Sequence, residues 1–577
     1  TRLSDGDSGQ RSVFRLTIPL VFPAGLSSCS GSAGNLISLA RDGQERVVLR
    51  GSSIAGVLRN LWRSAQKVSD RDPVVTDIFG SPAGDESPGQ SPLTVPDVVL
   101  EIGKSSSVSR MCHARNRHTG SVLDGCLFEV ESTPPGTRAE LTLWLESGRS
   151  LALEFMRCVL RHLREGVIFG GNGNRGVGLA RVDDQPDASG RRRPCGYRQY
   201  SLTDPEDLVA YLNDHRLWRE GKRFADYRTL PEGQGTAGDT LKVVFTLKIP
   251  RGQDLLIAEG ADMEPRQVTG ADGRKYFVLP GSTLHGLFRS WCTRLAAREG
   301  KNVSDSVNAF RERSAKGDYT GEKLGDENPI SDGEMDQYPI ESMFGSLYRK
   351  GRLHISDAFS PVPENGDNGV QFRVHVAVDA ISGGILDGLL FTKSVLTKGS
   401  FQVTLLLRNP QEDEVRWLVA TLGALDQGLL RLGSGKAAGR VTLEGSPDAS
   451  GALRDCFRKN WEKSHPGNAS DHQKNGMEET STQDPGISKV RGKLRSTMGR
   501  LWSCDPDDGT KSISIPGDLI QTVQKKEKWF RDRLSVVVTL DASGTAVAVE
   551  RAPRNEASPP PSRPTPSHAP ERPGGSV

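Results

Sequence analysis

Two short turns, at Gly51 and Gly281, combine a glycine with two hydroxyl residues directly before an apolar helical pattern. The hydroxyl residues are Ser52, Ser53, Ser282 and Thr283. The first N–H groups of a helix have no partner inside the helix, and the helix dipole favours an anion at that end. Arg59 and Arg289 follow close behind and add positive charge. These residues predict contacts with a phosphate backbone; simple helix capping, with both arginines in solvent, is the alternative.

Two glycine-rich loops, 170–178 and 433–439, each contain one cation, Arg175 or Lys436. Glycine lets a backbone approach a ligand closely, so we expect these cations to lie near the same phosphate chain. The loops lack the GxxxxGK[ST] spacing of a P-loop, and no parallel βαβ unit surrounds them as it would in a dinucleotide-binding turn.

A third candidate is the donor-rich segment 112–120, which includes Arg115 and Arg117. It leads into a predicted strand pair and suits a hairpin laid on a nucleic-acid backbone; a solvated surface hairpin is the alternative. Its counterpart at 375–383 is less basic, so we expect an unequal grip. A structural zinc site near Cys112, His113 and Cys126 lacks the usual close ligand pairs. His285, within the second turn, is a candidate for RNA contact or for capping and packing.

The same signatures recur in order in two halves of the chain, which indicates an internal duplication. The matching segments are 50–62 with 280–292, Phe-Gly-Ser at 79–81 with 344–346, Leu-Asp-Gly at 123–125 with 386–388, and the two glycine loops. Apolar residues alternate over 241–249, as in a strand, and recur at helical spacing behind each turn. Each copy has the order strand, helix, strands, helix, strand, which is the ferredoxin-like pattern.

We therefore predict an α+β fold of two tandem ferredoxin-like (RRM-like) domains with inserted hairpins. The expected segments are a first domain at 10–195, a connector with some helical character at 196–238, a second domain at 239–447 with a charged insertion at 300–340, and a polar C-terminal extension at 448–551 with short elements at 490–502 and 525–549. The Pro/Ser/Arg-rich tail at 552–577 is expected to be disordered.

Composition limits the class of protein. The chain has 577 residues, with 75 basic and 72 acidic side chains and a net charge of +3, which argues against a wholly basic nucleic-acid coat but allows basic patches. Its eight cysteines are scattered without a CxxC pair, as is typical of reduced thiols. No apolar run is long enough to cross a membrane, and the first residues lack a signal-peptide core. We expect a cytoplasmic protein without a membrane partner.

The ordered set of motifs resembles the RAMP superfamily over roughly 10–447. The set comprises Pro/Arg-Gly-Ser-Ser/Thr-x-x-Gly-x-x-Arg, Phe-Gly-Ser, Asp/Asn-x-x-(Ser/Thr)-Gly with a following Leu-Phe, and a glycine-rich loop. More narrowly, the chain looks like two fused backbone subunits of a type III CRISPR effector complex. The resemblance implies three kinds of partner: a CRISPR guide RNA, a complementary target RNA and other type III effector subunits. It also implies subunits that polymerise along the guide, and a hairpin from each that kinks the guide–target duplex.

In this family an acidic residue in the loop before the first helix promotes metal-dependent cleavage of the target RNA. Carried over by position, it falls on Asn35 in the first copy, and an amide can neither act as a general base nor hold a cation by charge. In the second copy it falls on Asp262, with Glu264 as the close alternative. Either would orient the attacking 2′-hydroxyl or hold Mg²⁺ or Mn²⁺. The resemblance thus implies an endoribonuclease acting on guide-paired target RNA; both acids as solvated loop charges are the alternative.

Three other functions stay open at this stage. A purely structural guide-binding subunit needs no acid. A guide-processing ribonuclease of the same superfamily normally uses histidine as acid and base, and no histidine occupies a suitable loop in both copies. A sugar- or nucleotide-modifying enzyme is not supported by any cofactor fingerprint.

Overall fold

The computed structural model describes most of both repeats and a few strands near the C-terminus. The described residues are 12–33, 35–81, 89–102, 107–115, 122–186, 193, 195–219, 228–230, 240–259, 264–303, 337–346, 350–364, 367–378, 384–433, 438–465, 503–504, 511–512, 536–540 and 546–551. The chain divides into two compact units, Thr1–Ala469, which contains both repeats, and Ser470–Val577. The expected disorder of 552–577 lies outside the described residues.

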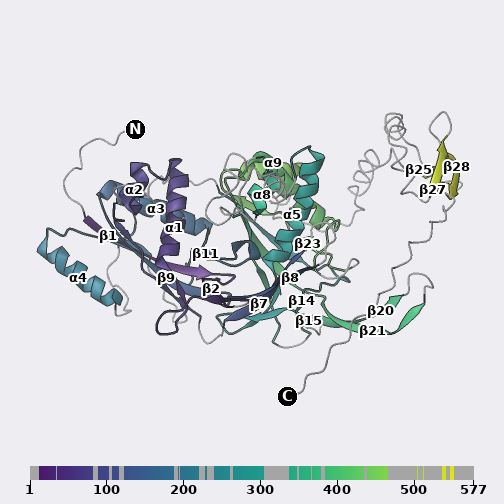
Figure 1. Ribbon diagram of the computed structural model, residues 1–577, viewed down its shortest axis with the longest axis horizontal. Coiled ribbons are helices and arrows are strands. Elements are labelled where there is room, and N and C mark those ends of the chain that lie inside the picture. The colour runs from purple at the N-terminus through teal and green to yellow at the C-terminus, as the bar shows by residue number, and fades with distance from the viewer. Residues whose placement is uncertain are drawn as a thin grey trace, which may run out of the picture. The chain divides into compact units, whose positions relative to one another are not determined.

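The first repeat is built on an antiparallel sheet with β1 (Ser12–Phe22) at its centre (Figure 1). Its other strands are β9 (Thr137–Ser147), β11 (Leu179–Val182), β10 (Val167–Ile168), β5 (Leu93–Thr94), β6 (Val98–Glu101), β4 (Val48–Leu49) and β12 (Gly196–Tyr200). β1 pairs with β9 along its whole length and with β11 near its end. Because strand side chains alternate between the two faces, Phe14, Leu16 and Ile18 all enter the core on one face.

Three helices cover that face of the sheet (Figure 1). They are α1 (Gly51–Gln66), α2 (Pro73–Phe79) and α3 (Arg149–Glu165). Trp62 of α1 and Phe79 of α2 each meet Phe155 of α3 edge to face, with ring centroids 5.6 Å apart. This geometry is favourable for aromatic rings and joins the three helices in one core.

The second repeat uses the same plan. Its main sheet contains β13 (Thr240–Lys248), β22 (Ser400–Arg408), β18 (Leu353–Ile355), β23 (Thr442–Leu443) and β24 (Asp448–Ser450), and its helices are α5 (Gly281–Arg298), α8 (Pro339–Phe344) and α9 (Glu412–Asp426). A smaller sheet joins β16 (Gln267–Thr269), β17 (Lys275–Leu279) and β19 (Ala358–Pro361). Leu16 lies opposite Leu143 in the first sheet, as Val243 lies opposite Leu405 in the second. The duplication expected from the sequence is confirmed in element order and register.

Each repeat also has hairpins outside its main sheet. In the first they are β2 (Cys29–Ala33) with β3 (Leu36–Leu39), and β7 (Val108–Arg115) with β8 (Val122–Ser132). In the second they are β14 (Ala258–Glu259) with β15 (Glu264–Pro265), and β20 (Val370–Val378) with β21 (Ile385–Leu396). β3 runs parallel to β8, and β15 lies beside β21, so the short hairpin contacts the long one in both repeats.

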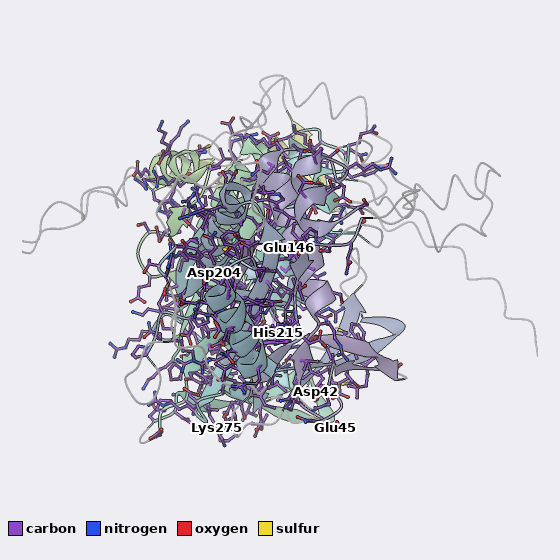
Figure 2. All side chains as sticks on the ribbon, turned by 90° about the vertical axis from the view of Figure 1, so that its left-hand side faces the viewer. Asp42, Glu45, Glu146, Asp204, His215 and Lys275 are labelled. Carbon is purple, nitrogen blue, oxygen red and sulfur yellow. The ribbon has the colours of Figure 1, made fainter. Side chains whose placement is uncertain are left out.

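A strand and a helix follow each repeat. After the first come β12 (Gly196–Tyr200), which pairs with β1, and α4 (Pro205–Arg219), which accounts for the helical character expected in the connector. Figure 2 looks onto α4, with Asp204 just before its start and His215 near its end. After the second come β24 and α10 (Arg454–Ser464), whose Phe457 and Trp461 are buried in the second core. Ordered packing therefore continues beyond residue 447, where we expected the second domain to end.

The second unit contributes two hairpins to the described structure. They are β25 (Ser503–Cys504) with β26 (Lys511–Ser512), and β27 (Val536–Leu540) with β28 (Ala546–Arg551). The second of these overlaps the element expected at 525–549. Among the described residues, no helix combines the length and the apolarity needed to cross a membrane.

Candidate nucleic-acid interface

An open cleft at the base of the β20–β21 hairpin is lined by cations. Its volume is about 650 Å³, and its lining includes Lys248, Arg251, Arg373 and Lys398 but no acidic side chain. The remaining lining residues are Ile249, Gly252, Gln253, Gln371, Thr397, Gly399 and Ser400. We call this region the basic cleft. A concave surface of one charge sign concentrates ligands of the opposite sign, so the cleft is suited to a polyanion.

Three different backbone features bring these cations together. Lys248 is the last residue of β13, and Arg373 lies within β20. Arg251 sits in a turn closed by a 3.0 Å hydrogen bond from Gln253 N to Pro250 O, and Gly252 takes the positive φ of 77° that this turn requires. Lys398 lies between β21 and β22. Strand ends and turns therefore place charges that are far apart in sequence around one cleft.

Three of the four cations of the cleft have acidic partners that do not line it. Lys248 pairs with Glu444, Arg373 with Asp254, and Lys398 with Asp367. The hydrogen bond from Lys398 holds the pKa of the Asp367 carboxyl below its usual value. Water screens exposed ion pairs strongly, so a phosphate can replace these carboxylates at little cost.

The β20–β21 hairpin presents apolar side chains to solvent. Phe372, Val374 and Val376 are 73%, 65% and 42% exposed, and their alternation places them on one face of β20. Figure 1 shows the hairpin extending away from the rest of the second repeat. The equivalent β7–β8 hairpin exposes Met111 and Leu127. Exposed apolar and aromatic groups next to a cationic cleft are suited to contact with nucleobases.

The hydroxyl residues of the two turns lie at the starts of α1 and α5, as expected. Ser52, Ser53 and Ser282 are exposed and Thr283 is half-buried. The first amide of each helix is already bound, however, because Gly51 N donates to Asp97 Oδ1 at 2.8 Å and Gly281 N donates to Asp357 Oδ1 at 2.7 Å. A phosphate at either helix start therefore has to contact the hydroxyls or the amides that follow, and not this first amide.

Three of the five arginines predicted to bind RNA have described side chains, and all three contact protein groups. Arg59 donates to Asp70, and Arg289 donates to the carbonyl of Gly345 in the Phe-Gly-Ser motif. Arg175 stacks over the ring of Phe128, 4.2 Å from its centroid. Each arginine thus contacts a loop, a helix end or a hairpin of its own repeat. Their contact with RNA stays a prediction.

His285 is buried on α5 against the ring of Phe344. Burial, with Arg289 nearby, lowers the pKa of His285 to about 4. The imidazole is therefore neutral at physiological pH, and its position fits the packing role that the sequence left open.

The acidic loop is only partly described. Asp262 lies outside the described residues, as do Arg117 and Lys436, and of Arg115 only the backbone in β7 is described. Glu264 is exposed at the start of β15 and faces Glu259 of β14 in register. Asn35 is exposed in the turn between β2 and β3, the corresponding place in the first repeat. Asn35 and Asp262 thus both lie, in sequence, between the strands of the short hairpin of their repeat, and their role in catalysis stays a prediction.

No three acidic, histidine or cysteine side chains among the described residues gather to hold a metal ion. Carboxylates are nevertheless the ligand type that Mg²⁺ prefers, and this ion commonly takes one or two protein carboxylates and completes its shell with substrate phosphate and water. The exposed carboxylate of Glu264 fits that pattern. Glu264 is therefore the right type of residue to bind this cation. Asp262 is the right type too, but this is known from the sequence alone.

Sequence reasoning missed the four cations of the basic cleft and the two aspartates at the helix starts. No short motif marks either set, because the members of each are distant in sequence. A usable signal existed for the aspartates, since Asp97 and Asp357 each follow a short strand, 93–94 and 353–355, that pairs with β9 or β22.

Comparison with known proteins identifies the family. The RAMP superfamily matches residues 13–181 and 266–441, more than half of the chain and one region in each repeat. The chain belongs to the RAMP superfamily, and its tandem organisation is as predicted. A search of the curated proteins found no match.

One solved structure was described as the "Cryo-EM structure of the Type III-B Cmr-beta bound to cognate target RNA". A chain of that complex is 14% identical over 29% of this chain and 96% of its own length, with a TM-score of 0.25. At that score the likeness carries no argument about function.

Proposed function

We propose that this protein is a guide-RNA-binding subunit of a type III CRISPR effector complex, in which it holds the guide and the complementary target RNA. The basic cleft carries this proposal, because four cations and no acid line a space open to a polyanion. Membership of the RAMP superfamily supports it independently. Other type III effector subunits are the partners, and the cytoplasm is the place of action.

The two long hairpins have the second role in this proposal. Each repeat is a ferredoxin-like platform, and β7–β8 and β20–β21 contact the bases of the paired strands. The exposed Phe372, Val374 and Val376 offer a larger apolar surface than Met111 and Leu127 do. Because base contact grows with apolar area, the second hairpin makes the stronger contact.

Target cleavage is assigned to the second repeat. Asp262 and Glu264 would bind a divalent cation, Mg²⁺ or Mn²⁺, which when bound stabilises charge on the scissile phosphate. One of the two carboxylates would orient the attacking 2′-hydroxyl and accept its proton, as a general base within hydrogen-bonding reach can. The 2′-oxygen then bonds to phosphorus as the bond from phosphorus to the 5′-oxygen breaks, and water protonates the leaving 5′-oxygen. The first repeat, with Asn35 in the corresponding turn, binds RNA without cleaving it.

The RNA-binding proposal is tested first by the nucleic acid that co-purifies with the full chain. Sequencing should return a discrete CRISPR-derived RNA. Affinity of the purified chain for that RNA is then compared between wild type, the double variant Arg251→Ala/Lys398→Ala and the control Lys275→Ala, which removes an exposed cation of β17.

Loss of two charged phosphate contacts should weaken binding at least tenfold and lower the slope of log Kd against log salt by about 0.7 per contact for a single strand. Lys275→Ala should change neither quantity. Equal affinities for the wild type and the double variant would show that the basic cleft is not the RNA site.

The purely structural alternative requires neither Asp262 nor Glu264. Guide-loaded protein with labelled target RNA and Mg²⁺ or Mn²⁺ separates the two functions. Asp262→Ala should abolish one cleavage product and leave guide binding intact, while Asn35→Ala leaves the products unchanged. Cleavage that survives in both Asp262→Ala and Glu264→Ala would remove the catalytic assignment.

A further inference from the structure

The outer face of the second sheet, opposite its helices, is covered by the first repeat. Leu406 of β22 packs against Ile168 and Leu179 at the β10–β11 edge of the first sheet. Arg181 donates to Thr404 Oγ1 at 2.6 Å. His354 Nδ1 also donates to the carbonyl of Gly173 in the first glycine loop. We call this contact the internal junction.

The corresponding positions on the first sheet follow from strand register. Thr94 lies opposite Trp144, as His354 lies opposite Leu406. Arg15 also lies opposite Trp144, as Lys242 lies opposite Leu406. The first-repeat counterparts of Leu406, Lys242 and His354 are therefore Trp144, Arg15 and Thr94.

Helix α4 covers two of these counterparts. Trp144 meets the rings of Tyr211 and His215 of α4, with centroids 5.6 and 5.5 Å away. Arg15 is fully buried and forms a salt bridge with Asp214 of the same helix. Figure 1 shows α4 on the opposite side of β1 and β9 from α1, α2 and α3. On the first sheet, α4 thus takes the place that a whole repeat takes on the second.

The contacts of α4 are of a kind that resists displacement. Tyr200 of β12 donates to the Asp214 carboxylate, and burial together with this hydrogen bond raises the pKa of Tyr200. Arg198 also lies within salt-bridge distance of Asp214. Lifting α4 would break the buried salt bridge between Arg15 and Asp214, and breaking a buried ion pair is strongly destabilising.

The edge of the second repeat that corresponds to the β10–β11 edge of the first repeat carries different side chains. Phe169 N donates to Gly178 O at 2.9 Å, and the equivalent bond in the second repeat runs from Leu432 N to Gly439 O at 2.8 Å. Their neighbours correspond accordingly. Ile168 and Leu179, buried in the junction, are replaced in the second repeat by Arg431 and Arg440, which are exposed.

We propose that α4 closes the outer face of the first repeat to any further repeat, and that Arg431 and Arg440 make the second repeat unfit for an apolar junction. The chain therefore does not extend head to tail with copies of itself through the interface that joins its halves. It enters an assembly as a single two-repeat unit. This inference rests on the fold and does not depend on RNA binding.

The test uses full-length chain freed of nucleic acid by nuclease and high salt, with mass measured by light scattering over a range of concentrations. The wild type should keep the mass of one chain. The surface variant Arg431→Ile/Arg440→Leu should also stay single, because α4 still closes the acceptor face. Assembly of that variant, absent from the control Arg454→Ile/Arg458→Leu on α10, would overturn the role of α4.

A second variant rebuilds both sides of the junction. It combines Arg431→Ile/Arg440→Leu with Arg15→Lys and Trp144→Leu, and replaces 205–219 by a Gly/Ser linker of equal length. Once circular dichroism shows it to be folded, it should form oligomers that grow with concentration. A folded protein that keeps the mass of one chain would overturn the proposal, as would a wild type that forms oligomers dissolved by Arg431→Glu/Arg440→Glu.

Discussion

The two helix starts show how one local structure serves two purposes. In the first repeat Asp97 accepts a hydrogen bond from the amide of Gly51 and forms a salt bridge with Arg50, and its side chain is 44% exposed. In the second repeat Asp357 binds the amide of Gly281 in the same way but is 1% exposed, because Arg110 of the first repeat pairs with it. Its own amide also donates to Gly176 O at 2.9 Å. The aspartate at the helix start therefore only caps the helix in the first repeat, whereas in the second repeat it also joins the two repeats.

The helices that follow the repeats show the same divergence. α10 stays with the second core, where Trp461 is buried, whereas α4 crosses to the outer face of the first sheet. The second outer face is already filled by the first repeat, so α10 has no place there. Burial of apolar area, not helix sequence alone, decides where each helix packs.

The largest difference between the repeats is expected for Asp357→Ala against Asp97→Ala. Removing Asp357 breaks its buried ion pair with Arg110 and should lower the free energy of unfolding by about 3–5 kcal/mol. Removing Asp97 costs only an exposed cap, about 1 kcal/mol. Both losses are measured in the full chain from the denaturant midpoint for unfolding of the unit Thr1–Ala469. Equal losses would mean that Asp357 is a cap and nothing more.

A smaller effect for each side chain is expected from acid at two buried histidines of the second repeat. Burial lowers the pKa of His354 to about 4, as it does for His285, while the unfolded value is near 6.5. Unfolded histidine therefore takes up protons first, so stability is complete above pH 6.5 and falls as pH drops toward 4. The loss is on the order of 3 kcal/mol for each imidazole.

The first repeat has Thr94 and Ala55 at the corresponding positions, and neither titrates. Stability measured from pH 7.5 to 4.5 should therefore fall less steeply in His354→Gln than in the wild type. A pH slope unchanged in both His354→Gln and His285→Gln would show that other groups cause the acid sensitivity.

The smallest effect tests whether α1 and α5 respond in the same way to the same substitution. Gly56 in α1 and Gly286 in α5 are exposed, and an added Cβ at either meets nothing within 4 Å. Alanine at each should raise stability by about 0.5–1 kcal/mol, since alanine has the higher helix propensity. As a contrast, a Cβ at Gly51 or Gly281 would come within 2.1 Å or less of a carbonyl oxygen, so alanine there should destabilise. Effects of opposite sign at Gly56 and Gly286 would break the equivalence.

Much of the fold was predictable, because its signals are local and occur twice. Alternation in 241–249, helical spacing behind Gly51 and Gly281, and four motifs in the same order each depend on a few neighbouring residues. The mapping of Asn35 onto the loop of the second repeat also agrees with the matching hairpins. The burial of Phe457 and Trp461 beyond the expected boundary at 447 was not predictable, because the polar composition of 448–465 gives no signal of a buried face.

The sequence by itself determined the duplication, the order of elements and the family, since period and motif order survive without a third dimension. Only the tertiary structure decided which cations share a cleft, which aspartates meet a helix start and which outer face receives α4. Lys248 and Lys398, or Arg15 and Asp214, are separated by more than a hundred residues. Their proximity depends on strand pairing and on competition for buried surface, and neither is written in any short stretch of chain.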